Sequence, residues 1–182
     1  MSEVILHTEK LIIRQADEML LPLILDFLNR NKLFFQKWEP LRKESFYSSE
    51  VQLQNLKALR NDDSQYRFYL FTQNEPDTIV GEIGLSNIVK GVYLNCTISY
   101  KLDQSMTGRG IMSEALREIE VFVFETLKLH RIEANIIPTN LKSLKLIRKL
   151  GFREEGLSKQ LLKINGIWED HLRFAKLNPK NI

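Results

Sequence analysis

The chain has 182 residues, of which 43% are hydrophobic and 27% are charged, and its formal net charge is +3. This balance is that of an ordinary globular protein, so it excludes the disordered, collagen-like and coiled-coil classes. The length fits one domain whose core is large enough to fold without disulfides or a metal. A charge this small and dispersed does not predict nucleic-acid binding, but it is compatible with a small anionic ligand.

Cysteine usage and the N-terminal pattern narrow the class further. The single cysteine, Cys96, cannot form a disulfide within the chain, and with only three histidines it does not make a convincing zinc cluster. The first twenty residues lack the pattern of a signal peptide, and no apolar run approaches the roughly 18 residues of a membrane span. We therefore predict a cytoplasmic protein with no metal, no direct nucleic-acid partner and no membrane partner.

The first third of the chain predicts one strand and three helical segments. Lys10–Arg14 is a strand, and Asp17 can cap an apolar helix whose start Pro22 can shift. The aromatic segment 31–38 predicts a short helix or turn. A serine pair then precedes, and can cap, a helix over Glu50–Asn61.

The middle third predicts an antiparallel meander of three strands. Tyr66–Thr72 is a strand by its aromatic content, and turn residues 74–77 separate it from a second strand over Thr78–Ile88. Lys90–Gly91 then turns the chain into a third strand over Val92–Leu102.

After the meander, the hydrophobic period changes from two to 3.6 residues. Ile111–Leu127 therefore predicts a helix of about four turns. Arg131–Ile137 is a strand, and Thr139 or Asn140 can cap a short helix that stops at Gly151. Strand, helix, strand and helix in this order suggest a crossover connection.

The chain ends in a predicted β-hairpin. Asn165–Gly166, the strongest two-residue hairpin signal, lies between strands predicted over Lys159–Ile164 and Ile167–Phe174. No repeat, linker or low-complexity segment divides the chain, so we predict a single domain.

A glycine loop, Asp103–Gly110, precedes the long helix. The first-turn amides of a helix have no helical partner and lie at the positive end of its dipole, while Gly108 and Gly110 permit close approach of a ligand. The loop is a candidate anion site, with a tight strand-to-helix turn as the alternative. It is not a dinucleotide fingerprint, because Ser113 stands where the third glycine would be, and no P-loop motif occurs.

Two sequence motifs carry a family resemblance. Ile98–Asp103 followed by Thr107–Leu116 looks like the acetyl-CoA motif of the GNAT superfamily of N-acetyltransferases. About thirty residues downstream, Asn140–Ser143 followed by Lys149–Gly156 looks like its second motif. Two motifs at the expected spacing are much stronger than a glycine loop alone.

Within the superfamily, the chain is most similar to the ribosomal-protein-alanine N-acetyltransferases. Asn31–Trp38 resembles their N-x-x-x-L-x-x-W region, and Asn165–His171 matches their NG-x-W-x-DH hairpin. The resemblance runs from about Lys10 to Leu177. It implies a single α/β domain over residues 1–182, with a mixed, mostly antiparallel sheet flanked by helices and with splayed strands that hold acetyl-CoA.

The resemblance also implies which residues bind acetyl-CoA, the co-substrate. The strand before the loop would pair its backbone with the pantetheine, the loop would supply amides to the pyrophosphate, and the second helix would face the pantetheine arm. The residues concerned are Tyr100, Leu102, Met106, Thr107, Gly108, Arg109, Gly110, Ile111, Met112, Asn140 and Ser143.

The candidate catalytic residues are Ser143 and Glu82. Many members of the superfamily use a tyrosine as the acid at the position of Ile147, whereas the ribosomal-protein subgroup uses the serine corresponding to Ser143. A small residue that packs closely against CoA is the alternative role for Ser143. A relative's glutamate base corresponds to Leu162, which cannot take a proton, so Glu82 on a central strand is the candidate base. A structural, hydrogen-bonding carboxylate is the alternative for Glu82. Asp170 and His171 are further candidates for the base, although the subgroup resemblance favours a hairpin-positioning or substrate-binding role for them.

The aromatic segment and the hairpin are expected to flank the acceptor entrance. The candidate substrate-binding residues are Phe35, Trp38, Trp168, Asp170 and His171. At pH 7, deprotonating an α-amine of pKa about 8 costs about 1.4 kcal/mol, whereas deprotonating a lysine side chain costs about 4.6 kcal/mol. The absence of a base would therefore slow acetylation of lysine more than acetylation of an α-amine.

We therefore predict an N-acetyltransferase that acts on a protein N-terminal α-amine, with ribosomal proteins among the candidate partners. Two alternatives remain open. The acceptor can be a small amine, such as a polyamine, an amino acid or an antibiotic, or the domain can be a non-catalytic acyl-CoA sensor. Analogy with relatives also suggests a homodimer.

Overall fold

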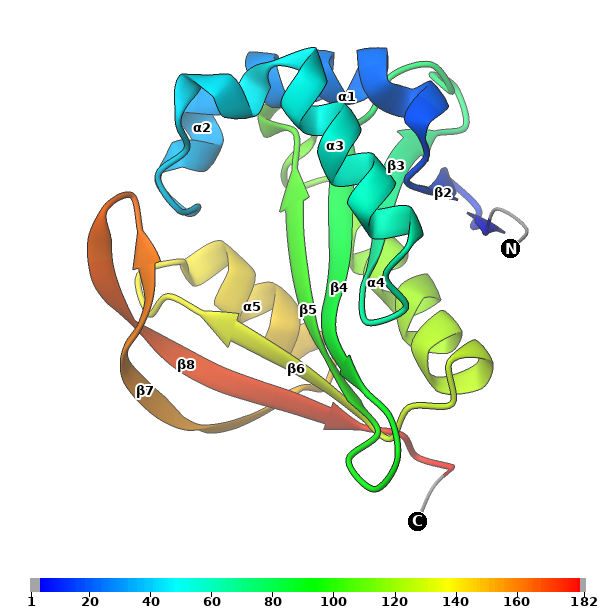
Figure 1. Ribbon diagram of the computed structural model, residues 1–182. Helices are drawn as coiled ribbons and strands as arrows, with labels where there is room; N and C mark the ends of the chain where they lie inside the picture. The colour runs from blue at the N-terminus through cyan, green and yellow to red at the C-terminus, as the bar shows by residue number, and fades with distance from the viewer. Residues whose placement is uncertain (1–3, 181–182) are drawn as a thin grey trace.

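The computed structural model describes residues 4–180, in which one eight-stranded sheet carries helices on both faces (Figure 1). Residues 1–3 and 181–182, at the two ends of the predicted domain, lie outside the described part. The strands are β1 (Ile5–His7), β2 (Leu11–Gln15), β3 (Tyr66–Thr72), β4 (Gly81–Val89), β5 (Asn95–Leu102), β6 (Arg131–Ile136), β7 (Arg153–Ile164) and β8 (Ile167–Leu177). The α-helices are α1 (Leu21–Arg30), α2 (Lys32–Gln36), α3 (Ser49–Arg60), α4 (Ile111–Val121) and α5 (Leu141–Lys149).

The sheet has the order β1-β2-β3-β4-β5-β6-β8-β7. Strands β1 to β5 pair antiparallel, which includes the predicted meander of β3, β4 and β5. Helix α4 then crosses to β6, which pairs parallel with β5, and β8 pairs antiparallel with both β6 and β7. The predicted mixed, mostly antiparallel sheet with a crossover is confirmed.

Alternate side chains of β3 enter two different hydrophobic cores. Phe68 and Leu70 pack in the core that includes α4 and α5, whereas Tyr69 and Phe71 pack in the core that includes α1, α2 and α3. A strand points successive side chains to opposite faces, and here both faces are covered. This explains why β3 is apolar and aromatic along most of its length.

Short-range signals placed several elements correctly. Asn140 caps α5, and Ser48 caps α3 by accepting from the amide of Val51. Asn165 and Gly166 both have positive φ, 44° and 84°, as the predicted tight hairpin requires. Each of these signals depends on residues only a few positions apart.

Other boundaries differ from the predictions. Asp17 caps a single 3₁₀ turn, Glu18–Leu20, and the α-helix begins only after it, with Pro22 in its first turn. The α-helical part of the predicted long helix ends at Val121 and continues as a π-helical turn over Phe122–Thr126.

The strand bounds near both ends of the sheet also differ. Strand β1 was not predicted, because three residues are too few to show a period. Strand β7 begins before the predicted Lys159, because its ladder with β8 continues across irregularities between Glu154 and Gly156 and between Ser158 and Leu162. Such bulges break the two-residue period on which the prediction depended.

Strands β5 and β6 are paired only at their beginnings. The parallel ladder joins residues 95–97 to residues 131–133, although β5 continues to Leu102 and β6 to Ile136. Figure 1 shows the two strands diverging beyond this ladder, with α5 beside the gap. Backbone N–H and C=O groups on the facing edges of these far halves are therefore not used by the sheet, and a ligand can pair with them.

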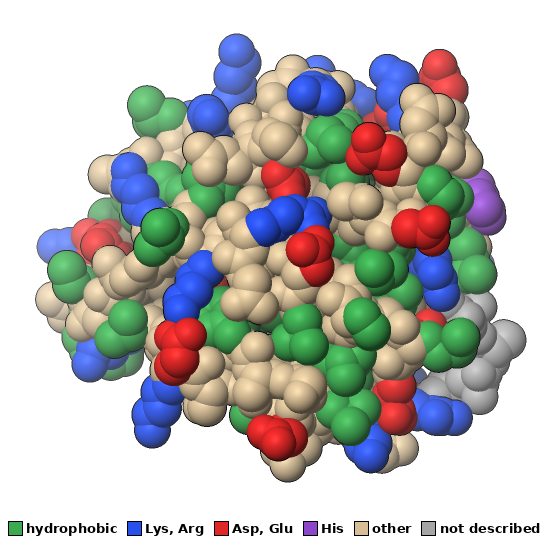
Figure 2. Space-filling model, turned by 90° about the horizontal axis from the view of Figure 1, so that it is seen from above, with side chains coloured by type: hydrophobic (Ala, Val, Ile, Leu, Met, Phe, Trp, Pro, Cys, Tyr) green, Lys and Arg blue, Asp and Glu red, His purple; other side chains and the backbone are tan. Residues whose placement is uncertain are grey.

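The surface over α1, α2 and α3 carries charges of both signs. Figure 2 shows basic and acidic side chains interspersed on this face, with no large field of one sign. Among residues 4–180, no helix combines the length and the apolar character needed to cross a membrane.

Candidate active site

The glycine loop forms an uncapped helix N-terminus at the end of β5. Gly108 and Gly110 both have φ of 81°, and Gly110 is the N-cap residue of α4, so no side chain caps the first-turn amides. A Cβ placed on either glycine would meet no atom within 4 Å, so these glycines are required by backbone conformation and border open space. This arrangement suits an anion.

The first turn of α4 also contains an unpaired hydroxyl. Ser113 is buried, and its Oγ has no hydrogen-bond partner among residues 4–180. Buried hydroxyls are normally hydrogen-bonded, so this one is an exception in the first turn of the helix that follows the loop. Ser113 belongs to the motif Thr107–Leu116, but nothing in the sequence indicates that its hydroxyl lacks a partner.

Tyr100 and Ser143 meet from opposite sides of the gap between β5 and β6. The Asn140 side chain accepts a hydrogen bond from the Ser143 amide at 3.2 Å, which fixes the serine in the first turn of α5. The Ser143 hydroxyl lies 2.6 Å from the Tyr100 hydroxyl. Burial raises the pKa of Tyr100 to about 12, despite the opposing effect of the Ser143 hydrogen bond, so the phenol stays protonated at neutral pH.

The side-chain contact of Tyr100 was not predicted. The sequence suggested only a backbone role for this residue, because nothing local shows that its ring will reach a helix more than forty positions away. Ile147, at the position of the tyrosine acid of many relatives, is fully buried in the core. The hydroxyl pair of Tyr100 and Ser143 is therefore the polar group that α5 and β5 bring together here.

Glu82 lies in a row of polar side chains on the opposite face of the sheet. It is the cross-strand neighbour of Tyr69 on β3 and of Lys101 on β5. Its carboxylate oxygens lie 3.6 Å from Lys101 Nζ and 3.7 Å from Arg67 Nε. Burial raises the pKa of the Glu82 carboxyl, but the two cations and a hydrogen bond with Tyr69 together outweigh burial and leave the pKa below its ordinary value. Glu82 is therefore ionised at neutral pH.

Lys101 links this row to the segment after α2. Its Nζ lies 2.9 Å from Glu39 Oε1 and 5.2 Å from the centre of the Phe35 ring. The backbone carbonyl of Glu39 accepts a hydrogen bond from the amide of Asn165, at the tip of the β7–β8 hairpin, at 2.9 Å. Gln36 Nε2 also donates to Asn165 Oδ1 at 3.3 Å. The structure thus joins the aromatic segment to the hairpin tip, the two parts expected to flank the acceptor.

The predicted substrate residues differ in exposure. Trp168 is 57% exposed on β8, and Trp38 is partly buried with Lys37 Nζ 4.7 Å from its ring centre. Phe35 and His171 are buried, and His171 Nδ1 lies 2.9 Å from the Glu169 carbonyl oxygen. The two tryptophans can touch an acceptor directly, whereas the two buried residues contribute through the shape of the surrounding structure.

Asp170 holds the hairpin. Its Oδ1 accepts a hydrogen bond from the amide of Gln160 at 2.8 Å. Gln160 has a positive φ of 48° and lies in the irregular part of the β7–β8 ladder. The carboxylate therefore stabilises a backbone conformation that an L-residue rarely adopts.

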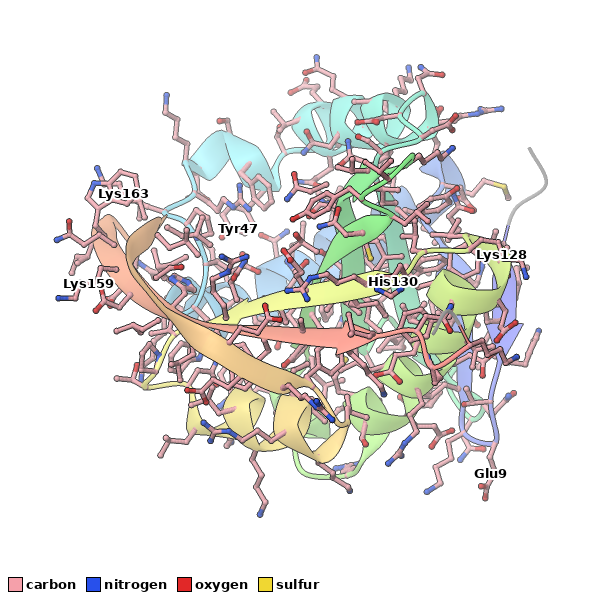
Figure 3. The ribbon with its side chains drawn as sticks, turned by 90° about the horizontal axis from the view of Figure 1, so that it is seen from below. Glu9, Tyr47, Lys128, His130, Lys159 and Lys163 are labelled. Carbon is pink, nitrogen blue, oxygen red and sulfur yellow. The ribbon has the colours of Figure 1, made fainter. Side chains whose placement is uncertain are left out.

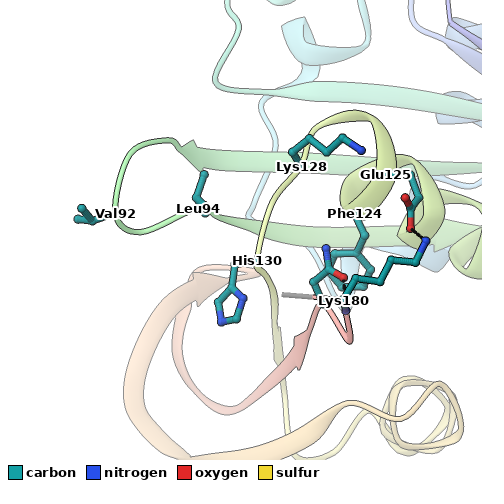
Figure 4. A pocket seen from close by; sticks show the side chains of 8 residues that line it. Val92, Leu94, Phe124, Glu125, Lys128, His130 and Lys180 are labelled. Atoms are coloured by element: carbon teal, nitrogen blue, oxygen red, sulfur yellow. Dashed lines mark hydrogen bonds and ion pairs between the residues drawn. The ribbon is translucent and has the colours of Figure 1, made fainter. Parts of the chain in front are cut away.

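A cavity of about 530 Å³ lies elsewhere, at the paired beginnings of β5 and β6 (Figure 4). None of the residues predicted for catalysis or binding lines it. Figure 3 shows Lys128, one of its lining residues, at the other end of the molecule from the hairpin lysines Lys159 and Lys163. The cavity is lined by Val92, Leu94, Phe124, Glu125, Lys128, His130, Asn178 and Lys180.

No group of three or more potential metal ligands occurs among residues 4–180. The described polar groups that converge near the gap are hydroxyls, carboxylates, amides and a lysine ammonium. These groups can bind an anion at the glycine loop and orient a hydroxyl at the gap. The charged row around Glu82 lies on the opposite face of the sheet.

Comparison with known proteins gives consistent results. Residues 10–153 match the family model described as an acetyltransferase (GNAT) domain. The chain is 34% identical to the ribosomal protein uS5-alanine N-acetyltransferase of Escherichia coli (strain K12) over 177 residues, which cover 96% of this chain and 91% of that protein.

Two solved structures extend this similarity to the fold. The ribosomal-protein-S5-alanine acetyltransferase from Vibrio fischeri matches with a TM-score of 0.90 at 32% identity, over 97% of each chain. Mycobacterium smegmatis RimJ, in complex with CoA-disulfide, matches with a TM-score of 0.87 at 26% identity, over 94% of this chain and 83% of that one.

Proposed function

Because this chain belongs to the GNAT acetyltransferase family and is an N-acetyltransferase, we propose that it transfers acetyl from acetyl-CoA to the α-amine of a protein N-terminus, with ribosomal proteins as the acceptor class. The observation that carries the acceptor is the similarity, along nearly the whole chain, to an enzyme named for acetylating the alanine of ribosomal protein uS5. A ribosomal acceptor also implies a cytoplasmic location. The homodimer remains a prediction.

The donor would bind across the glycine loop and the gap between β5 and β6. Amides from Met106 to Met112 would hold the pyrophosphate, and the unpaired backbone of Tyr100 and Leu102 would hold the pantetheine. Asn140 and Ser143 would face the donor from α5. The uncapped N-terminus of α4 and the open space beside both glycines support this placement.

The reaction needs a neutral amine close to the thioester carbonyl, and positioning both groups supplies much of the acceleration. We propose that Ser143 protonates or stabilises the leaving sulfur. Tyr100 stays protonated and can donate a hydrogen bond to Ser143 Oγ. This hydrogen bond leaves the serine hydrogen free to point away from Tyr100. Because a thiol has a pKa of about 8.5, this help is moderate in size.

We propose that Glu82 accepts the amine proton through water, late in the reaction. Its lowered pKa makes it too weak a base to deprotonate a free ammonium group. The nitrogen becomes much more acidic as it bonds to the carbonyl carbon, and at that stage an ionised carboxylate can take the proton. This order favours an α-amine, part of which is already neutral at pH 7, over a lysine side chain.

The test is release of free thiol from acetyl-CoA with a panel of N-terminal peptides and small amines. We expect turnover with peptides that begin with alanine or serine, and none with Gly108→Glu, which places a carboxylate in the anion site. Turnover with polyamines, amino acids or antibiotics alone would contradict the peptide acceptor. Acetyl-CoA binding without turnover on any amine would instead favour the sensor alternative.

A further inference from the structure

A polar cluster, in which two of the three residues are buried, joins the donor loop to the helices on the acceptor side. We call residues 104–110, which are the glycine loop without Asp103, the donor loop. We call residues 32–39 the acceptor segment. The cluster consists of Arg30 at the end of α1, Asn31 between α1 and α2, and Asp103 between β5 and the donor loop. Asn31 is 2% exposed and Asp103 is 7% exposed, so water does not compete strongly for their hydrogen bonds.

Asp103 uses both carboxylate oxygens to hold the start of the donor loop. Oδ1 accepts from the Ser105 amide at 2.9 Å and from the Ser105 hydroxyl at 2.7 Å. Oδ2 accepts from Arg30 Nε at 2.7 Å and from Asn31 Nδ2 at 2.9 Å. Burial raises the pKa of Asp103, but these hydrogen bonds outweigh it and hold the pKa well below its ordinary value, so the carboxylate is ionised.

Asn31 contacts both sides of the junction. Its Oδ1 accepts from the Gln104 amide at 3.1 Å, and its Nδ2 also donates to the Phe27 carbonyl at 3.1 Å. The next residue, Lys32, begins α2, which carries Phe35 and leads to Glu39. A displacement of the loop that breaks the contacts of Gln104 and Asp103 therefore removes two of the three side-chain hydrogen bonds that hold Asn31, the residue directly before the acceptor segment.

We propose that Asn31 and Asp103, supported by Arg30, are positioning residues that join the donor loop to the acceptor segment, so that acetyl-CoA binding and the order of the acceptor entrance depend on each other. The proposal rests on the donor site described under Proposed function. None of the three residues needs to touch either substrate. They act through the shape of the loop and through the start of α2.

The test uses acetyl-CoA titration by calorimetry and amide hydrogen exchange, neither of which requires a known acceptor. The variants are Asp103→Asn, which removes the negative charge at nearly constant volume, and Asn31→Leu, which removes the hydrogen-bonding groups and keeps the branched shape of the side chain. Arg30→Met is a milder third variant, because Arg30 supplies only one of the hydrogen bonds to Asp103 and methionine keeps an unbranched apolar side chain at the position whose guanidinium carbon lies 5.6 Å from the centre of the Phe27 ring. The matched control is Glu120→Gln, which also removes a buried carboxylate, 2.6 Å from Lys176 Nζ, but on a later turn of α4.

We expect the Kd for acetyl-CoA to rise about tenfold or more in Asp103→Asn and Asn31→Leu, and to change less than about twofold in Glu120→Gln. In the unaltered protein, acetyl-CoA should slow exchange both in the donor loop and in the acceptor segment. In the two cluster variants, the slowing should be lost in the acceptor segment. Arg30→Met should show the same pattern with a smaller change in Kd.

Three results would overturn the proposal. The first is a folded cluster variant that binds acetyl-CoA as tightly as the unaltered protein. The second is an acceptor segment whose exchange does not respond to acetyl-CoA. The third is an equal loss of affinity in Glu120→Gln, which would indicate general loosening of the fold. If the unaltered protein itself does not bind acetyl-CoA, the result refutes the proposed donor site, and the proposed coupling is refuted with it.

Discussion

Tyr100→Phe isolates the contact between Tyr100 and Ser143, because it removes one hydroxyl and keeps the aromatic ring. The two hydroxyl oxygens lie 2.6 Å apart, and the ring packs partly buried against the core that includes α5. Burial raises the pKa of Tyr100 to about 12, so the phenol is protonated over the range of about pH 6–9 in which an assay would be run. The substitution therefore removes a hydrogen-bond donor and no charge.

The expected loss follows from the strength of one hydrogen bond. Such a bond contributes about 0.5–1.5 kcal/mol, and about 1.4 kcal/mol corresponds to a tenfold change in rate. We expect kcat at saturating acetyl-CoA to fall about two- to tenfold. The KM for acetyl-CoA should change less than about twofold, because the backbone of β5 and the packing of the ring are retained.

The assay is thiol release with the most active peptide of the panel, for Tyr100→Phe, Ser143→Ala and the double variant. If the tyrosine acts through the serine, Tyr100→Phe should have no further effect once Ser143 is alanine. Thermal melting of each variant controls for loss of fold. An unchanged kcat in Tyr100→Phe, or the same fall in both backgrounds, would refute the role given to this hydroxyl.

Three other predictions test the loop, the charged row and the acceptor. Gly110→Ala should lower the melting midpoint by about 2–8 °C in calorimetry, because a left-handed φ costs alanine about 1–2 kcal/mol; an unchanged midpoint would show that the loop relaxes freely. Glu82 has a lowered pKa, so the stability it contributes is present above the ordinary carboxyl pKa and is lost as pH falls through the folded value. Chemical denaturation below about pH 4.5 should therefore show a shallower pH dependence for Glu82→Gln than for the unaltered protein, and equal slopes would argue against the ion pairs. Finally, kcat/KM for a peptide should rise with pH up to about 8, where the acceptor amine becomes neutral. If the pH profile of kcat/KM showed a second titration near pH 7 that disappeared in Glu82→Gln, the Glu82 carboxyl would titrate far above the range that the structure supports.

Local signals in the sequence were reliable where one backbone conformation needed particular neighbours. Asn140 caps α5, Asn165–Gly166 forms the hairpin turn, and Gly108 and Gly110 adopt positive φ before α4. These features depend on side chains and backbone groups within a few positions of each other, so the sequence contains everything that specifies them. The meander and the crossover followed from hydrophobic periods for the same reason.

Boundaries were less predictable where tertiary packing overrode the local pattern. Strand β7 continues through two irregularities because β8 remains beside it, and α4 changes to a π-helical turn at Phe122 within the core. A period of two or 3.6 residues cannot register an extra residue that a neighbouring strand or helix accommodates. Such changes of pitch and register become visible only when both partners are in place.

The sequence alone determined the class of fold, the glycine loop and the residues from which a donor site could be built. Only the tertiary structure decided which side chains complete that site. It pairs Tyr100 with Ser143, places Glu82 between two cations and brings Asn31 to Asp103 across more than seventy positions. These contacts depend on strand register and on how helices pack against the sheet, and both are fixed by burial of apolar side chains over the whole molecule rather than by neighbours in the chain.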